Sequence, residues 1–133
     1  MMNKFDITKT ARPSTIEVIE LEDNNNGEFH TGEHWNFSIL QKVTVGENKA
    51  VEEIWNLWKN LPSAKMCMRC HIPKFGLRFL SDTHEVILDA SICWECHNIY
   101  IKTPQEFTYC YFKASESHSK KLLLNIKKLL ENQ

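Results

Sequence analysis

Cysteines are the residues of this chain whose type and spacing are best suited to chemistry. Four of the five form two C-x-x-C pairs, Cys67 with Cys70 and Cys93 with Cys96, and 22 residues separate the pairs. Two intervening residues let one tight turn direct both sulfurs of a pair toward a single ion, and zinc prefers four tetrahedral ligands such as thiolates. We therefore predict that Cys67, Cys70, Cys93 and Cys96 bind one structural zinc.

The expected compartment supports ligand roles for these thiols. Residues 1–18 contain neither the apolar core nor the cleavage site of a secretory signal, and the longest apolar runs are far shorter than a membrane span. We expect a cytoplasmic protein without a transmembrane segment, and cytosolic thiols stay reduced. The cysteines are then first interpreted as ligands, catalysts or core residues, and only afterwards as disulfides.

A histidine follows each pair, which opens a second interpretation. Cys70-His71 and Cys96-His97 complete two C-x-x-C-H motifs, the pattern of covalent c-type haem attachment. Both motifs lie beside segments with strand patterns, and no export signal is visible, so we favour zinc. Two details fit a zinc ribbon less well: the gap exceeds the usual 15–20 residues, and ribbons often have Gly where these histidines stand.

A third interpretation is thiol redox chemistry. Lys65 and Arg69 are close enough in sequence to stabilise a thiolate at Cys67. Neither pair opens a helix after a strand, however, as a thioredoxin-like site does. The fifth cysteine, Cys110, lies within a strand pattern, and we expect it to be a small buried hydrophobic residue.

The surrounding elements predict how the two pairs meet. Alternating or β-branched segments predict strands, and apolar residues at helical spacing predict one helix from an N-cap at Asn48 to Pro62 and another from about Ser115. The predicted strands are 14–22, 35–45, 76–80, 85–92, 98–103 and 106–112. We expect an α+β fold with a mainly antiparallel sheet, two packing helices and a zinc-ribbon-like hairpin that carries both cysteine knuckles.

Length and composition indicate one folded domain, residues 1–133. The chain is 42% hydrophobic and 25% charged, both ordinary for a globular protein. Within this domain we expect residues 1–13 to be a loose N-terminal lead-in and residues 65–103 to be the cysteine-knuckle hairpin.

Charge and motifs narrow the classes of function. The net charge of −1 gives no overall attraction to a polyanion. Lys65, Arg69, Lys74 and Arg78 do cluster around the first pair, but we favour a solvated face there over a nucleic-acid site. No nucleophile–base–orienter set and no Gly-rich phosphate loop is visible. The sequence therefore favours a non-enzymatic protein.

The stretch CHIPKFGLRF…ASICWECHNIY resembles small, functionally uncharacterised bacterial proteins with the pattern C-x-x-P-x-[HYF]-G-L-R-F, a hairpin and [IV]-C-[FW]-x-C-x-N. The likeness covers residues 70–130 and implies a compact domain without assigning an activity. Many such proteins have one upstream cysteine, so Cys67 is a departure. The remaining hypotheses are a zinc-stabilised binding domain for a protein partner, a thiol-redox protein, a c-type haem protein and an immunity-type partner of a toxin.

Overall fold

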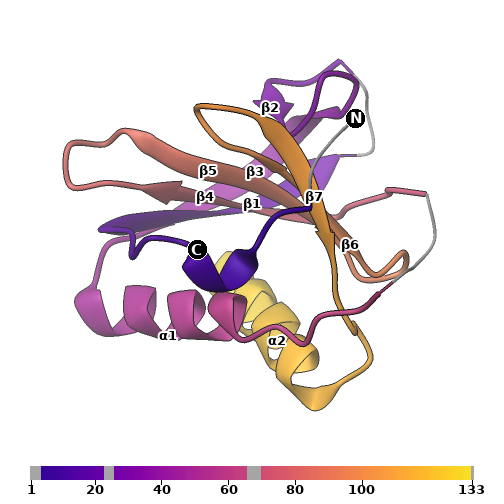
Figure 1. The fold of residues 1–133 in the computed structure, drawn as a ribbon. Coiled ribbons are helices and arrows are strands. Elements are labelled where there is room, and N and C mark those ends of the chain that lie inside the picture. Colours follow the sequence, from indigo (N-terminus) through magenta and orange to yellow (C-terminus); the bar gives the residue numbers. More distant parts are fainter. Residues whose placement is uncertain (1–3, 23–25, 66–69, 133) are drawn as a thin grey trace.

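The protein folds into an antiparallel sheet with two helices on one face (Figure 1). The structure is a computed structural model, and it describes residues 4–22, 26–65 and 70–132. Across these ranges the sheet has seven strands in the order β2-β3-β1-β4-β5-β6-β7, and each neighbouring pair is antiparallel. The predicted α+β class is confirmed. The elements are η1 (Ile7–Lys9), β1 (Thr15–Glu22), β2 (Phe29–His30), β3 (Asn36–Val45), α1 (Asn48–Lys59), β4 (Phe75–Leu80), β5 (Val86–Cys93), β6 (Asn98–Lys102), β7 (Phe107–Tyr111) and α2 (Ser117–Glu131).

The central strands are buried on both faces. In β1, Ile16 and Val18 belong to the core beneath the helices, whereas Ile19 and Leu21 belong to a second cluster on the opposite face. Successive side chains of a strand point to opposite faces, so a strand covered on both sides has apolar residues of both parities. In β5, all residues from Leu88 to Cys93 are buried.

Both helices present an apolar stripe to the sheet. Val51, Ile54 and Trp58 of α1 are buried, as are Leu122, Ile126 and Leu130 of α2. Residues spaced by three or four positions share one side of a helix, which is the pattern predicted for both segments.

The start of α1 differs from the prediction. Asn48 is the first helical residue, and the N-cap is Glu47, whose side chain makes no capping hydrogen bond. The Asn48 side chain instead accepts a hydrogen bond from Arg12. A tertiary contact has therefore replaced the local cap that was predicted.

The segment expected to be a loose lead-in is held against the domain from Lys4 onward. Thr10 accepts hydrogen bonds from two indoles, Trp58 Nε1 to its hydroxyl at 2.9 Å and Trp55 Nε1 to its carbonyl at 3.1 Å. Lys4 also forms an isolated parallel bridge with Tyr109 of β7. These contacts are long-range, so local sequence patterns do not reveal them.

A zinc-ribbon-like hairpin is not shown as a separate unit. The β4–β5 hairpin lies in the middle of the main sheet, because β4 also pairs with β1 and β5 also pairs with β6. Strand patterns predict hairpins but do not reveal which further strands pair with them. Among the described helices, none is long and apolar enough to span a membrane.

Candidate functional site

Three of the four predicted ligand cysteines meet where the segment before β4 passes the β5–β6 turn. Cys70 and Cys96 are joined by a disulfide, with their Cα atoms 6.0 Å apart. Cys93 remains a thiol: its Sγ accepts the Cys96 N–H at 3.2 Å and donates to the Ile72 carbonyl at 3.5 Å. Cys67 lies outside the described residues. The structure thus brings the described part of both motifs to one place.

The turn from Cys93 to Cys96 folds back on itself. The Cys96 N–H points at Cys93 Sγ, so one tight turn holds the two residues of the pair together. His97 adopts φ = 57°, the left-handed conformation expected at the position where ribbons often have Gly. Its Nδ1 accepts the Ala114 N–H at 3.3 Å, which helps to hold this less favourable backbone.

Within residues 4–22, 26–65 and 70–132, no group of three or more His, Cys, Asp or Glu side chains is arranged to hold a metal ion. Metal coordination uses thiolates, whereas the sulfurs of Cys70 and Cys96 are bonded to each other, and Cys67 lies outside the described residues. Reduction would return two thiols beside Cys93.

A chain of buried hydrogen bonds lies directly behind the cysteines. His71 places Nδ1 2.7 Å from Asn98 Oδ1 and Nε2 2.6 Å from Ser91 Oγ, and Ser91 Oγ lies 2.8 Å from Thr31 Oγ1. The Asn98 amide nitrogen donates to the Cys70 carbonyl at 2.6 Å. Asn98 therefore links the backbone of the first motif to the strand that follows the second.

The donor of each hydrogen bond in this buried network can be assigned, starting from Asn98. Since its amide nitrogen donates to Cys70, its oxygen faces His71, and Nδ1 of His71 must carry the proton. Nε2 is then an acceptor, so the Ser91 hydroxyl donates to it and Thr31 donates to Ser91. This arrangement needs a neutral ring, and burial lowers the pKa of His71 to about 4 against the opposing effect of the Asn98 hydrogen bond.

The connectivity Ser91–His71–Asn98 matches a nucleophile, a base and an orienting group, which sequence inspection did not detect. All three side chains are at least 95% buried, and Ser91 is fully so. A nucleophile must reach substrate, so this geometry favours a structural role. His71 is also enclosed by rings: it stacks on Tyr100 at 3.9 Å between centroids and meets Trp35 edge-on at 5.5 Å. With both nitrogens engaged, the geometry does not favour haem ligation by His71.

The basic residues expected around the first pair do not act as one cluster. Lys65 and Lys74 are exposed, whereas Arg69 lies outside the described residues. Arg78 is partly buried and forms ion pairs with Glu17 at 2.9 Å and Asp89 at 2.6 Å. Burial raises the pKa of Asp89, and the Arg78 guanidinium partly offsets that rise. Arg78 is therefore committed within the fold.

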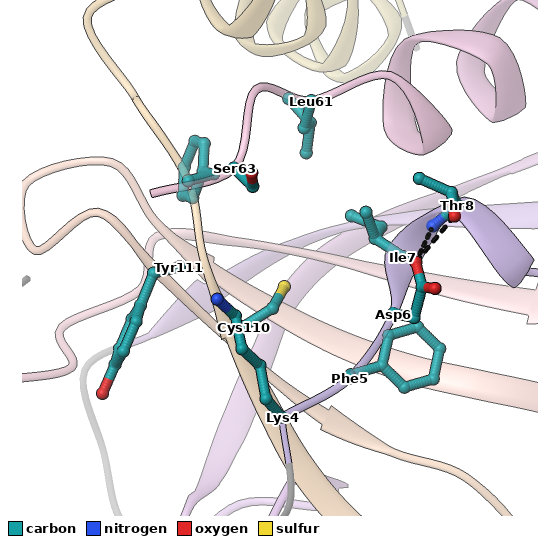
Figure 2. Close-up of a pocket in the computed structure, with 10 residues that line it drawn as sticks. Lys4, Phe5, Asp6, Ile7, Thr8, Leu61, Ser63, Cys110 and Tyr111 are labelled. Atoms are coloured by element: carbon teal, nitrogen blue, oxygen red, sulfur yellow. Dashed lines mark hydrogen bonds between the residues drawn. The ribbon is translucent and has the colours of Figure 1, made fainter. Parts of the chain in front are cut away.

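Cys110 is buried, with 5% of its surface exposed, as predicted. It lines a hollow of about 360 Å³ between β7 and the N-terminal segment, and Figure 2 shows its sulfur directed into that space. The Asp6 carboxylate at this hollow accepts hydrogen bonds from Thr8. Cys110 lies on β7, whereas the three clustered cysteines lie before β4 and around the β5–β6 turn, and Cys110 belongs to the main core.

Comparisons with known proteins give no family assignment: no protein-family model, no curated protein and no solved structure matches the chain.

Proposed function

We propose that the protein is a non-enzymatic binding domain whose fold is stabilised by a structural zinc at Cys67, Cys70, Cys93 and Cys96. The observation that carries the proposal is the meeting of Cys70, Cys93 and Cys96 at the β5–β6 turn. Four thiolates from paired C-x-x-C turns form a closed tetrahedral site, which leaves no open position for catalysis. Cys67 supplies the fourth sulfur in this proposal.

The turn from Cys93 to Cys96 supports a metal-binding knuckle. The Cys96 N–H directed at Cys93 Sγ and the left-handed residue after the pair would both persist around a bound ion. Asn98 and His71 would hold the Cys70 backbone in place from behind, and such outer contacts orient metal ligands. The resemblance to small bacterial proteins adds a compact domain to this proposal, but no activity.

A second candidate, a thiol-redox protein, is favoured by one observation, the disulfide between Cys70 and Cys96. This disulfide joins the two motifs, whereas a dithiol oxidoreductase cycles the two cysteines within one C-x-x-C. Cys93 and Cys96 are also almost fully buried, with 1% and 2% exposed. We therefore rank this candidate below the structural site.

Metal content and thiol content, measured on the same freshly purified sample, distinguish the two. The zinc form is expected to contain one zinc per chain and to release five reactive thiols when unfolded with a chelator, because the chain has five cysteines. The form with the Cys70–Cys96 disulfide leaves three. A Cys110→Ser variant, which removes a thiol away from the site, should keep its zinc, and a Cys96→Ser variant should lose it. Reduced protein without stoichiometric zinc would overturn the proposal.

A further inference from the structure

A groove of about 360 Å³ runs beside the cysteine site, between the two cysteine-bearing segments and α2. Its floor is the buried Ile92, and its apolar walls are Ile72, Phe75, Trp94 and Leu123. Ile72 is 49% exposed although it is a large aliphatic residue. An apolar hollow of this size is in the range of small binding pockets.

The cysteine site holds the walls of this groove together. Ile72 follows Cys70 by two residues, and Trp94 lies between Cys93 and Cys96. The Cys70–Cys96 link and the Cys93 contact with the Ile72 carbonyl join these two segments. The groove is therefore set by the same residues that the proposed zinc would bind.

Trp94 is fixed in orientation at the groove wall. Its Nε1 donates to the Ser119 carbonyl of α2 at 3.3 Å. Its ring meets Phe75 edge-on at 6.3 Å and Phe112 at 5.8 Å between centroids. A pre-positioned aromatic ring binds an apolar side chain without a further ordering cost, and such rings are common at the energetic centre of interfaces.

The rim of the groove is positively charged. Lys74 and Lys127 line it and are exposed, and Glu95 is the acidic residue in the same lining; Lys127 also borders a shallower hollow that contains Glu20 and Glu131. Lys120 precedes Lys127 by seven residues, so two helical turns place it on the same side of α2. Among the residues that the structure describes, none of these three lysines forms an ion pair. Their charges remain available to an acidic partner.

We infer that this groove binds a short acidic segment of a partner protein, with one bulky apolar side chain of that segment inserted against Trp94 and Phe75. The inference rests on the proposed binding function and names the chemistry of the partner. The aliphatic part of the lining, Ile72, Ile92 and Leu123, suits an apolar side chain better than the polar edges of a nucleic-acid base, so we assign the occupant to protein.

A second lysine-bearing hollow on the other side of α2 provides the matched control. Lys121 and Lys128 line it together with Leu124, next to α1. That hollow is smaller, at about 220 Å³, and has no aromatic residue in its lining. Charge reversal of these two lysines changes the net charge by the same amount as reversal of Lys74 and Lys127, and neither residue lines the proposed groove.

The test uses a fluorescein-labelled peptide with four Asp, four Glu and one central Trp. We expect Lys74→Glu/Lys127→Glu to raise its Kd by about tenfold or more, since two exposed charge contacts are reversed. Lys121→Glu/Lys128→Glu should change it by less than about twofold, and replacing the peptide Trp by Ala should weaken binding in the wild type. The Trp94 indole N–H signal, assigned with a Trp94→Phe variant, should shift on peptide addition.

The results separate the inference from the function on which it rests. Equal loss of affinity in both double variants, an unmoved Trp94 signal, absence of peptide binding, or displacement of the peptide by single-stranded RNA would each overturn the groove inference. Zinc and thiol content are measured on the same samples: peptide binding by reduced protein without stoichiometric zinc would refute the metal part of the proposed function and leave the groove inference standing.

Discussion

Replacing Asn98 by alanine tests whether the buried hydrogen bonds behind the cysteines support the fold. The change removes the acceptor for His71 Nδ1–H, at 2.7 Å, and the donor to the Cys70 carbonyl, at 2.6 Å. The side chain is 1% exposed, so water does not readily replace it. Each buried polar group left without a partner costs about 1–3 kcal/mol. Because Cys70 itself is only partly buried, we expect a total loss of about 2–4 kcal/mol in the free energy of unfolding.

Urea unfolding under identical redox conditions measures this loss. With a slope of about 1–3 kcal/mol per M for a small domain, the midpoint should fall by roughly 1–2 M. Asn125→Ala is the matched control, since Asn125 donates to Glu53 at 2.9 Å in an exposed pair, and its loss should cost less than about 0.5 kcal/mol. Equal midpoints for Asn98→Ala and the wild type would refute the argument that these hydrogen bonds support the fold.

Two further substitutions test the sheet. Gly76→Ala would place a Cβ 3.0 Å from the Ala90 carbonyl oxygen and from the Phe29 ring. We therefore expect the free energy of unfolding, measured in urea, to fall by about 1–3 kcal/mol. Unchanged stability would mean that the cluster around Phe29, on the face of the sheet opposite the helices, is loosely packed. Arg78→Met leaves the Glu17 and Asp89 carboxylates, with 13% and 11% of their side chains exposed, without their shared cation, and should cost about 2–3 kcal/mol at pH 7. Burial already raises the pKa of Asp89, and a raised folded-state pKa means that stability is lost as pH rises through it. The Arg78→Met deficit should therefore shrink as the pH is lowered, and a deficit that grows on acidification would contradict this reasoning.

The sequence was sufficient to predict the elements with strong periodicity. The apolar stripe of α2 and the alternation in β3 place both elements within two residues of their observed bounds. β2 escaped prediction because it has only two residues, and the pairing of β4 with β1 escaped because strand patterns do not encode partners.

The candidate site could be predicted only in part for similar reasons. Spacing alone indicated that Cys70, Cys93 and Cys96 approach one another, and the structure places them together. The hydrogen-bond network that links Thr31, Ser91, His71 and Asn98 could not be anticipated, since its residues come from distant segments and meet only through tertiary contacts. The nearest signals were the positions of His71, one residue after Cys70, and Asn98, two residues after Cys96.

The parallel bridge between Lys4 and Tyr109 bears on the order in which the chain can fold. The outer edge of β7 is covered by two segments that precede it in sequence: Phe5 donates to the Tyr109 carbonyl at 2.6 Å, and Ala64 donates to the Tyr111 carbonyl at 3.1 Å. Contacts between segments so far apart in sequence require a long loop to close, so we expect them to form after the pairing of neighbouring strands. Until then β7 presents unpaired N–H and C=O groups to any neighbouring chain. Refolding yield should therefore depend on protein concentration during this last docking step, when the same edge can recruit a second molecule.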